Sequence, residues 1–107
     1  MRLPDLSHLQ FVVIGALLNE ERTGREIRAE LKRYRVRQSG PAFYQMMARL
    51  EKSDLVEGWY EQEVVDGQII KERCYRITAR GSKAWRECRR FYEKAIARDG
   101  DEGLAHA

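Results

Sequence analysis

The chain has 107 residues, of which 43% are hydrophobic, so it can form one domain with a modest core and is too apolar to be disordered by composition. No apolar run approaches the roughly 20 residues that a membrane-spanning helix needs. Pro4 and Asp5 interrupt the N-terminal stretch, which therefore does not resemble a signal peptide. These features predict a soluble, cytoplasmic protein.

The net charge of +3 is unevenly distributed along the chain. Residues 22–49 carry eight basic and two acidic side chains, and residues 73–98 carry nine and two. Residues 50–72, between them, carry two basic and seven acidic side chains. Because a polyanion responds to the local field, the two basic blocks make nucleic acid a candidate partner. The alternative is that these side chains only solvate two helices.

The first helix is expected over residues 7–19, where Ser7 and Gln10 form a capping box. It is apolar almost all round, which is typical of a helix buried on several sides. In so small a domain, part of that surface would meet a second subunit.

A polar connection leads to a second helix, capped by Thr23 with Glu26 three positions later. Ile27, Leu31 and Tyr34 follow the helical period of about 3.6 residues and are expected to point inward.

Ser39 is expected to cap a third helix that ends at Lys52. Its inward contacts are assigned to Phe43 or Tyr44, Met47, Leu50 and then Leu55. The second and third helices, with their short connection, form a helix-turn-helix unit. Asp54 follows the third helix and tolerates a left-handed conformation.

Two alternating segments, Val56–Val65 and Gln68–Ile77, are joined by Asp66-Gly67, which favours a type I′ hairpin turn. A helix followed by a long hairpin in a short basic chain indicates a winged helix-turn-helix. The predicted fold class is mainly α with a small β-hairpin, extended by a C-terminal dimerisation helix.

Thr78 should cap that last helix, Ala79 to about Arg98. Its spaced residues Trp85, Cys88, Tyr92 and Ile96 approach a coiled-coil seam, which packs either on its own domain or, as we expect, on a second chain. The domain prediction is thus a DNA-binding domain over residues 1–78, a dimerisation helix over 79–98 and a disordered acidic tail over 99–107.

Catalysis has little support, because no glycine-rich phosphate loop, Ser/His/Asp constellation or metal-ligand spacing is present in the sequence. We predict no enzyme, cofactor or metal. Cys74 and Cys88 are expected to be buried thiols. Glu57, Glu61 and Glu63 should share one solvated face of a strand.

The third helix should direct Ala42, Gln45, Arg49 and Lys52 away from the core. Gln45 suits an adenine edge and Arg49 a guanine edge. A helix N-terminus offers N–H donors to phosphate. Contacts to the DNA backbone are expected from Arg25, Arg28, Arg37, Ser39, Gly40 and Lys52, and contacts from the wing are expected from Gln68, Lys71 and Arg73.

Over about residues 9–92 the chain resembles the PadR-like transcriptional regulators. The resemblance lies in Val-Ile-Gly-Ala-Leu at 13–17, Thr-Gly-Arg-Glu-Ile at 23–27, Phe-Tyr-Gln-Met-Met-Ala-Arg-Leu-Glu-Lys at 43–52 and Arg-Cys-Tyr-Arg-Ile-Thr-Ala-Arg-Gly at 73–81. It implies a homodimeric winged-helix repressor of the short branch, with the C-terminal helix as the dimer arm. It also implies a possible aromatic effector between the arms, where Trp85 and Tyr92 are the matching positions.

The sequence therefore predicts a DNA-binding transcriptional regulator that binds a pseudo-palindromic operator as a homodimer. One alternative is a winged-helix protein-interaction module without specific DNA binding, which the acidic segment 50–72 favours. Another is an architectural protein that binds all duplexes alike.

Overall fold

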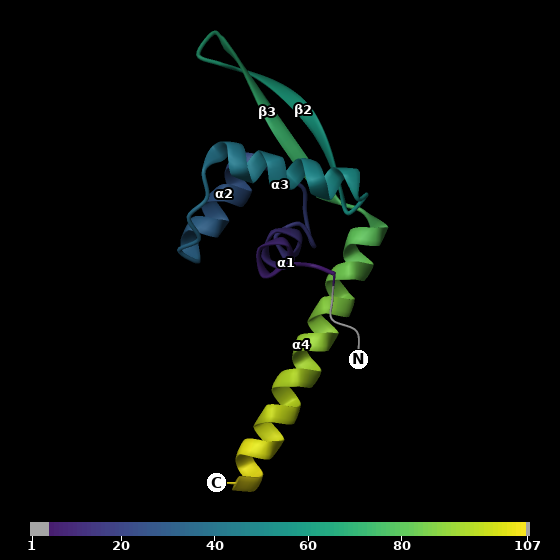
Figure 1. The fold of residues 1–107 in the computed structure, drawn as a ribbon. Coiled ribbons are helices and arrows are strands. Elements are labelled where there is room, and N and C mark those ends of the chain that lie inside the picture. The colour runs from purple at the N-terminus through teal and green to yellow at the C-terminus, as the bar shows by residue number, and fades with distance from the viewer. Residues whose placement is uncertain (1–4, 107) are drawn as a thin grey trace.

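The computed structural model describes residues 5–106, with side chains described for residues 5–97. The helices are α1 (His8–Gly15), α2 (Gly24–Arg33), α3 (Gly40–Lys52) and α4 (Ala79–His106), and the strands are β1 (Arg22–Thr23), β2 (Val56–Val65) and β3 (Gln68–Ile77). The first three helices form a cluster, from which the β2–β3 hairpin and α4 project in opposite directions (Figure 1). The predicted winged helix-turn-helix with a C-terminal helix is confirmed.

α1 begins as expected but ends early. Ser7 and Gln10 form the predicted capping box. The helix stops at Gly15 instead of reaching residue 19, because Leu17 donates its N–H to the Ile14 carbonyl at 3.0 Å and so tightens the backbone into a turn. That turn places Leu17 in the core, where it is 2% exposed.

α2 and α3 end in the same way. Arg35 and Asp54 each adopt a positive φ of 59° just after a helix. The next residue then donates its N–H back into the last turn, from Val36 to the Leu31 carbonyl and from Leu55 to the Leu50 carbonyl, both at 3.0 Å. The expectation for Asp54 is confirmed.

Tyr34 was expected to point inward, and this prediction is wrong. It is the C-cap of α2 and is 63% exposed. Because the chain reverses at Arg35, the half-buried Val36 packs against the core in its place. On α3, Phe43 is buried and Tyr44 is 40% exposed, which settles the alternative between them, and Met46 joins the core unexpectedly.

The sheet is antiparallel in the order β1–β3–β2, and the hairpin strands have the predicted bounds. Asp66 and Gly67 have φ values of 52° and 77°, as the predicted turn requires. The additional strand β1 pairs Arg22 with Tyr75 and Thr23 with Cys74. It lies in the stretch expected to be a plain connection, and two residues are too short to show an alternating pattern.

α4 starts where Thr78 accepts the Gly81 N–H at 2.9 Å through its hydroxyl oxygen. The helix continues to His106 instead of ending near Arg98, so it runs through the stretch that was assigned to a tail. No proline lies between Arg98 and His106, and glycine weakens a helix without breaking it. Within the described residues, no helix is both long and apolar enough to cross a membrane.

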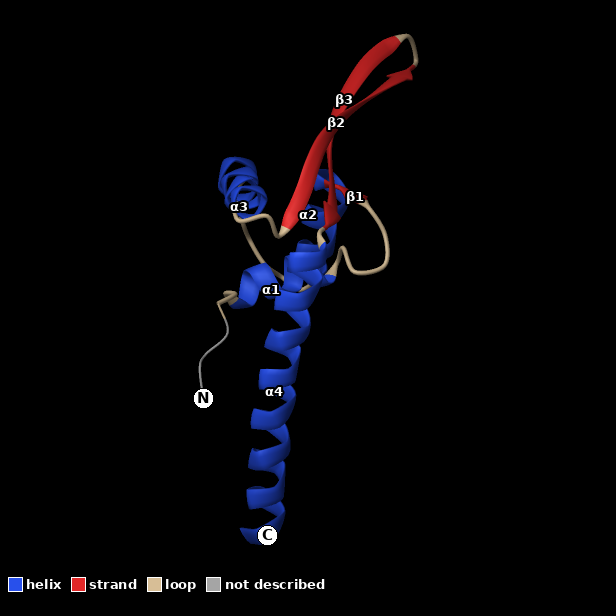
Figure 2. Ribbon diagram, turned by 90° about the vertical axis from the view of Figure 1, so that its right-hand side faces the viewer, coloured by secondary structure: helices blue, strands red, loops and turns tan. Residues whose placement is uncertain are grey.

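The molecule is 65 Å long and 27 by 23 Å across, with a radius of gyration of 17.1 Å. A compact domain of this size has a radius of gyration of about 13 Å. The excess comes from the hairpin and from α4, which extend away from the helical cluster (Figure 2).

Candidate nucleic-acid interface

α3 divides into a buried and an exposed face. Phe43, Met46, Met47 and Leu50 are buried, which fixes the helix on the core. Gln45, Arg49 and Lys52 are exposed, and Ala42 is half-buried beside them. No hydrogen bond or ion pair to the side chains of Gln45, Arg49 or Lys52 is found within the described part of the chain. The amide of Gln45 and the guanidinium of Arg49 are therefore free to reach base edges.

The N-terminus of α3 lies beside a cation. The Ser39 hydroxyl accepts the Ala42 N–H at 3.2 Å. A Cβ atom placed on Gly40 would lie 3.5 Å from the Nη1 atom of Arg28, so the guanidinium adjoins the first turn of the helix. Free N–H groups and a nearby positive charge suit a phosphate group. Arg37, in the loop before α3, is exposed and adds a second positive charge at this end of the helix.

The two faces of the hairpin differ in charge. Because strand residues alternate and Tyr60 pairs with Arg73 and Gln62 with Lys71, these four residues share one face. The opposite face carries Glu57, Trp59, Glu61 and Glu63 on β2 and Glu72, Cys74 and Arg76 on β3. The acidic side chains of β2 and the basic residues Lys71 and Arg73 are therefore separated by the sheet.

The basic face of the hairpin is turned toward α3. Arg73 forms a half-buried ion pair with Glu51 of α3. The guanidinium of Arg73 lies 4.6 Å from the centre of the Tyr60 ring, and the ammonium of Lys71 lies 4.4 Å from it. Arg73 thus fixes the wing to α3, while Lys71 remains exposed.

Two further predicted contacts lie apart from this face. Arg25 is 77% exposed and forms an ion pair with Glu72 at 3.3 Å, so its charge is partly compensated. Gln68 is exposed beside the hairpin turn, on the acidic face. On that face Arg76 donates to Glu57 at 2.6 Å, and the Trp59 indole donates to Glu61 at 3.0 Å.

Sequence reasoning did not assign three other residues to this interface, although it considered Tyr44 as an inward contact. Tyr44, Ala48 and Tyr60 line a hollow of about 490 Å³ between α3 and the hairpin, together with Lys71 and Arg73. A Cβ atom on Gly24 would lie 2.8 Å from the Tyr44 hydroxyl oxygen, so glycine at this position leaves room for the tyrosine. The sequence feature that could have assigned Tyr44 to this interface is its position next to Gln45 on the helix.

α4 packs on its own domain near its start and extends beyond it afterwards. Trp85 stacks on Phe11 of α1, with ring centres 5.2 Å apart and planes at 6°. The Tyr92 hydroxyl lies 3.1 Å from Nδ1 of His8. Cys88 is fully buried within the chain, whereas Ile96 is 70% exposed. The four stripe residues are therefore divided between the core and the surface.

Neither cysteine has the features of a reactive site. Cys74 and Cys88 are free and buried, as predicted. Burial raises the pKa of both thiols, and Glu61 adds to the effect on the pKa of Cys74. Thiolate is the nucleophilic form, so both side chains act as small hydrophobes. Among the described residues, no His, Cys, Asp and Glu side chains gather into a group that could hold a metal ion.

Known structures share this fold. A PadR family transcription regulator from Clostridium difficile has a TM-score of 0.71 at 17% identity, over 92% of this chain and 99% of that chain. A PadR-like transcriptional regulator from Bacillus cereus has a TM-score of 0.69 at 20% identity, over 87% and 88%. Bacillus subtilis PadR in complex with operator DNA has a TM-score of 0.62 at 15% identity, over 76% and 46%.

The sequence profile of the PadR-like family of transcriptional regulators matches residues 13–87. The chain therefore belongs to this family, which confirms the resemblance seen in the sequence. Members of the family are transcription regulators and not enzymes, as predicted for this chain. No curated protein has a sequence that matches this one.

Proposed function

We propose that this protein is a sequence-specific DNA-binding regulator that represses transcription from a pseudo-palindromic operator as a homodimer. The observation that carries the proposal is the arrangement of charge. Within the described residues, the exposed Arg49 and Lys52 of α3 and Lys71 of the hairpin have no carboxylate partner, while the glutamates of β2 lie on the opposite face of the hairpin. This separation also weakens the alternative of a protein-interaction module.

In the proposed complex α3 lies in the major groove. Gln45 and Arg49 read base edges, each contributing about 1–3 kcal/mol of discrimination if the contact is bidentate. Ser39, Gly40, Arg28 and Arg37 contact phosphate at the start of α3, with Ala42 close to the DNA surface and Lys52 on the backbone. Lys71 and Gln68 contact the backbone from the wing, which Arg73 holds in place. The similarity in fold to B. subtilis PadR, whose structure contains operator DNA, supports DNA binding by a chain of this fold.

The homodimer is proposed to form through α4. Residues 93–97 of this helix are all exposed, including Ile96, so the chain itself leaves this part of α4 uncovered. A helix in water is stabilised mainly by packing of its apolar side, and a second copy of α4 would supply that packing. A two-fold dimer would present two copies of α3 to the DNA. We also propose a cytoplasmic location, because a regulator of this kind would act on chromosomal DNA.

A small aromatic effector is proposed to bind near Trp85. The indole nitrogen of Trp85 is buried without a hydrogen-bond partner among the described residues. Trp85, Phe11 and Tyr34 line a hollow of about 470 Å³. In a Trp59→Phe variant, fluorescence reports Trp85 alone. We expect flat aromatic compounds to quench this fluorescence. An unchanged signal across a broad panel of compounds would contradict the proposed effector site.

DNA binding is tested by gel shift at a series of salt concentrations. We expect affinity to fall steeply with salt, since each phosphate contact releases counterions. Lys71→Ala should reduce the slope of log K against log salt concentration by about 1, which is the contribution of one phosphate contact. Lys94→Ala, on the exposed part of α4, is the matched control and should leave the slope unchanged. Failure to retard any duplex at low salt would instead favour the interaction module, and equal retardation of all sequences would favour an architectural protein.

Repression is tested with a reporter gene whose promoter contains a preferred binding site, obtained by selecting bound fragments from random duplex DNA. Expression should fall when the protein is produced and recover with the Arg49→Ala variant. An increase in expression would make the protein an activator.

A further inference from the structure

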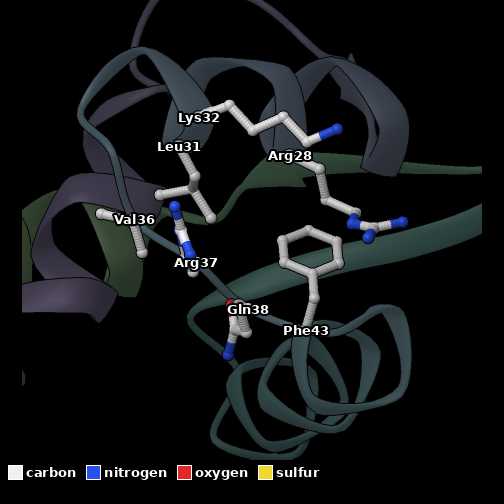
Figure 3. A pocket seen from close by; sticks show the side chains of 7 residues that line it. All are labelled: Arg28, Leu31, Lys32, Val36, Arg37, Gln38 and Phe43. Atoms are coloured by element: carbon white, nitrogen blue, oxygen red, sulfur yellow. The ribbon is translucent and has the colours of Figure 1, made fainter.

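A further pocket, separate from the hollow at Trp85 and from the one between α3 and the hairpin, lies between α2 and the N-terminal half of α3. It has a volume of about 200 Å³. Figure 3 shows Arg28 and Lys32 reaching over it from α2, Phe43 rising from α3, and Arg37 between the two helices. Its full lining is Arg28, Leu31, Lys32, Val36, Arg37, Gln38 and Phe43.

The pocket combines an apolar base with a cationic rim. Leu31 and Phe43, which are 3% and 0% exposed, close the base of the pocket, and the half-buried Val36 supplies the apolar surface that a ligand can reach. Three cationic side chains belong to the lining, and no acidic side chain does. No ion pair or hydrogen bond of the Arg28, Lys32 or Arg37 side chains occurs within the described residues. Their charges are therefore available to an anion.

A third feature is a buried polar atom that lacks a partner. The Oε1 atom of Gln38, in the lining, is buried and accepts no hydrogen bond within the described part of the chain. A buried acceptor without a donor is unfavourable, and most such atoms in proteins are satisfied by protein, water or ligand. A ligand hydroxyl could donate to it.

We propose that this pocket binds a small hydroxy-carboxylate with a branched alkyl body. The carboxylate would pair with the cationic rim, since guanidinium groups bind carboxylates with directed hydrogen bonds. The alkyl body would lie against Val36 and the methylene groups of the rim side chains, above the buried Leu31 and Phe43, and the hydroxyl would donate to Gln38. An apolar cavity of about 150 Å³ holds a benzene molecule, so about 200 Å³ accommodates a body of this size with its polar groups. Inorganic phosphate would pair with the cationic rim and leave the apolar surface of Val36 uncovered.

The test is calorimetric titration of the full chain, without DNA, with 2-hydroxy-4-methylpentanoate. Because no DNA is present, the result is independent of the proposed operator binding. We expect saturable binding, and at least about tenfold weaker binding in Arg37→Gln, which removes a charge-assisted hydrogen bond at an exposed position. Arg33→Gln is the matched control, because Arg33 is exposed on α2 and outside the lining; its affinity should not change.

Four probes separate the contributions. 4-Methylpentanoate lacks the hydroxyl and should bind more weakly, 4-methyl-1-pentanol lacks the carboxylate, and lactate lacks the alkyl body. The alcohol and lactate should show no saturable binding. Inorganic phosphate binding as tightly as the hydroxy acid would overturn the proposal, because the rim alone would then account for affinity. Equal affinity of Arg37→Gln and the unchanged protein would also overturn it.

Discussion

Gln45 and Arg49 are the residues on which the proposed sequence readout depends. Both are exposed on α3 and neither is held by another side chain in the described part of the chain. Arg49→Ala should weaken binding to the preferred site by about 1–3 kcal/mol and relax preference at one position of each half-site. Gln45→Ala should act in the same way at a different position.

Competition binding with single-base variants of the site measures this effect. Lys52→Ala serves as the comparison, since the loss of a phosphate contact lowers affinity for all sequences alike. Uniform weakening by Arg49→Ala across all sequence variants would make Arg49 a backbone contact.

Tyr75 connects stability to alkaline pH. It is 1% exposed. Burial raises the pKa of its hydroxyl from 10.0 to about 12; Glu51 adds to the increase and Arg73 opposes it. The folded state therefore disfavours ionisation. The contribution of the protonated Tyr75 hydroxyl to the free energy of unfolding is therefore complete below pH 10. It is lost as the pH rises to about 12, because the tyrosine of the unfolded chain releases its proton at a lower pH than that of the folded chain.

Urea denaturation between pH 9 and about 12 measures this loss, which should reach about 2–3 kcal/mol. The two buried thiols contribute a loss of the same sign, so Tyr75→Phe isolates the share of the tyrosine. If Tyr75→Phe loses stability as steeply as the unchanged protein, the hydroxyl is not the cause.

Periodicity was enough to predict which α3 residues face outward, because a helix anchored by Phe43, Met47 and Leu50 can turn only one side to solvent. It could not predict the partners of the cations. The Arg73–Glu51 contact joins residues 22 positions apart, and such pairs form only once the hairpin has packed on α3. The contact between Arg25 and Glu72 likewise depends on tertiary packing.

At the scale of elements, local signals predicted the hairpin bounds and the helix starts. Asp66-Gly67 and the capping residues act through bonds within a few residues. The same local reasoning extended α1 too far. It missed β1 because the pairing of Thr23 with Cys74 joins segments that are distant in the sequence.

Thr78, which directly follows β3, connects two helices. Its hydroxyl donates to the Asp54 carbonyl at 2.6 Å and accepts the Gly81 N–H at 2.9 Å, so it joins the end of α3 to the start of α4. Thr78→Ala should lower the free energy of unfolding by about 1–2 kcal/mol, because both bonds are lost. Thr78→Ser retains the hydroxyl and should recover most of the stability.

Urea denaturation at fixed protein concentration measures both variants. Equal destabilisation by Thr78→Ser and Thr78→Ala would show that the methyl group, and not the hydroxyl, is responsible.

At the scale of the whole molecule, the proposed dimer depends on the part of α4 that extends beyond the domain. Ile96 is 70% exposed at the end of a stripe that begins at Trp85. Ile96→Glu should shift the protein toward monomer, because the glutamate would be buried without a partner in a helix pair. Sedimentation equilibrium measures the association constant directly.

Lys94→Glu is the control, since it introduces the same side chain on the opposite side of α4. An equal loss of dimer in both variants would indicate a general charge effect. If Ile96→Glu leaves the association constant unchanged, the dimer interface does not include this stripe.

The most direct measurement is selection of bound fragments from random duplex DNA, followed by footprinting of the enriched site. A two-fold pair of winged helices predicts two inverted half-sites with centres about 34–36 Å apart, on one face of the duplex. The half-sites should lose their enrichment together in the Arg49→Ala variant. A single unpaired motif, or fragments enriched without any shared sequence, would contradict the proposal of a dimer that reads DNA through α3.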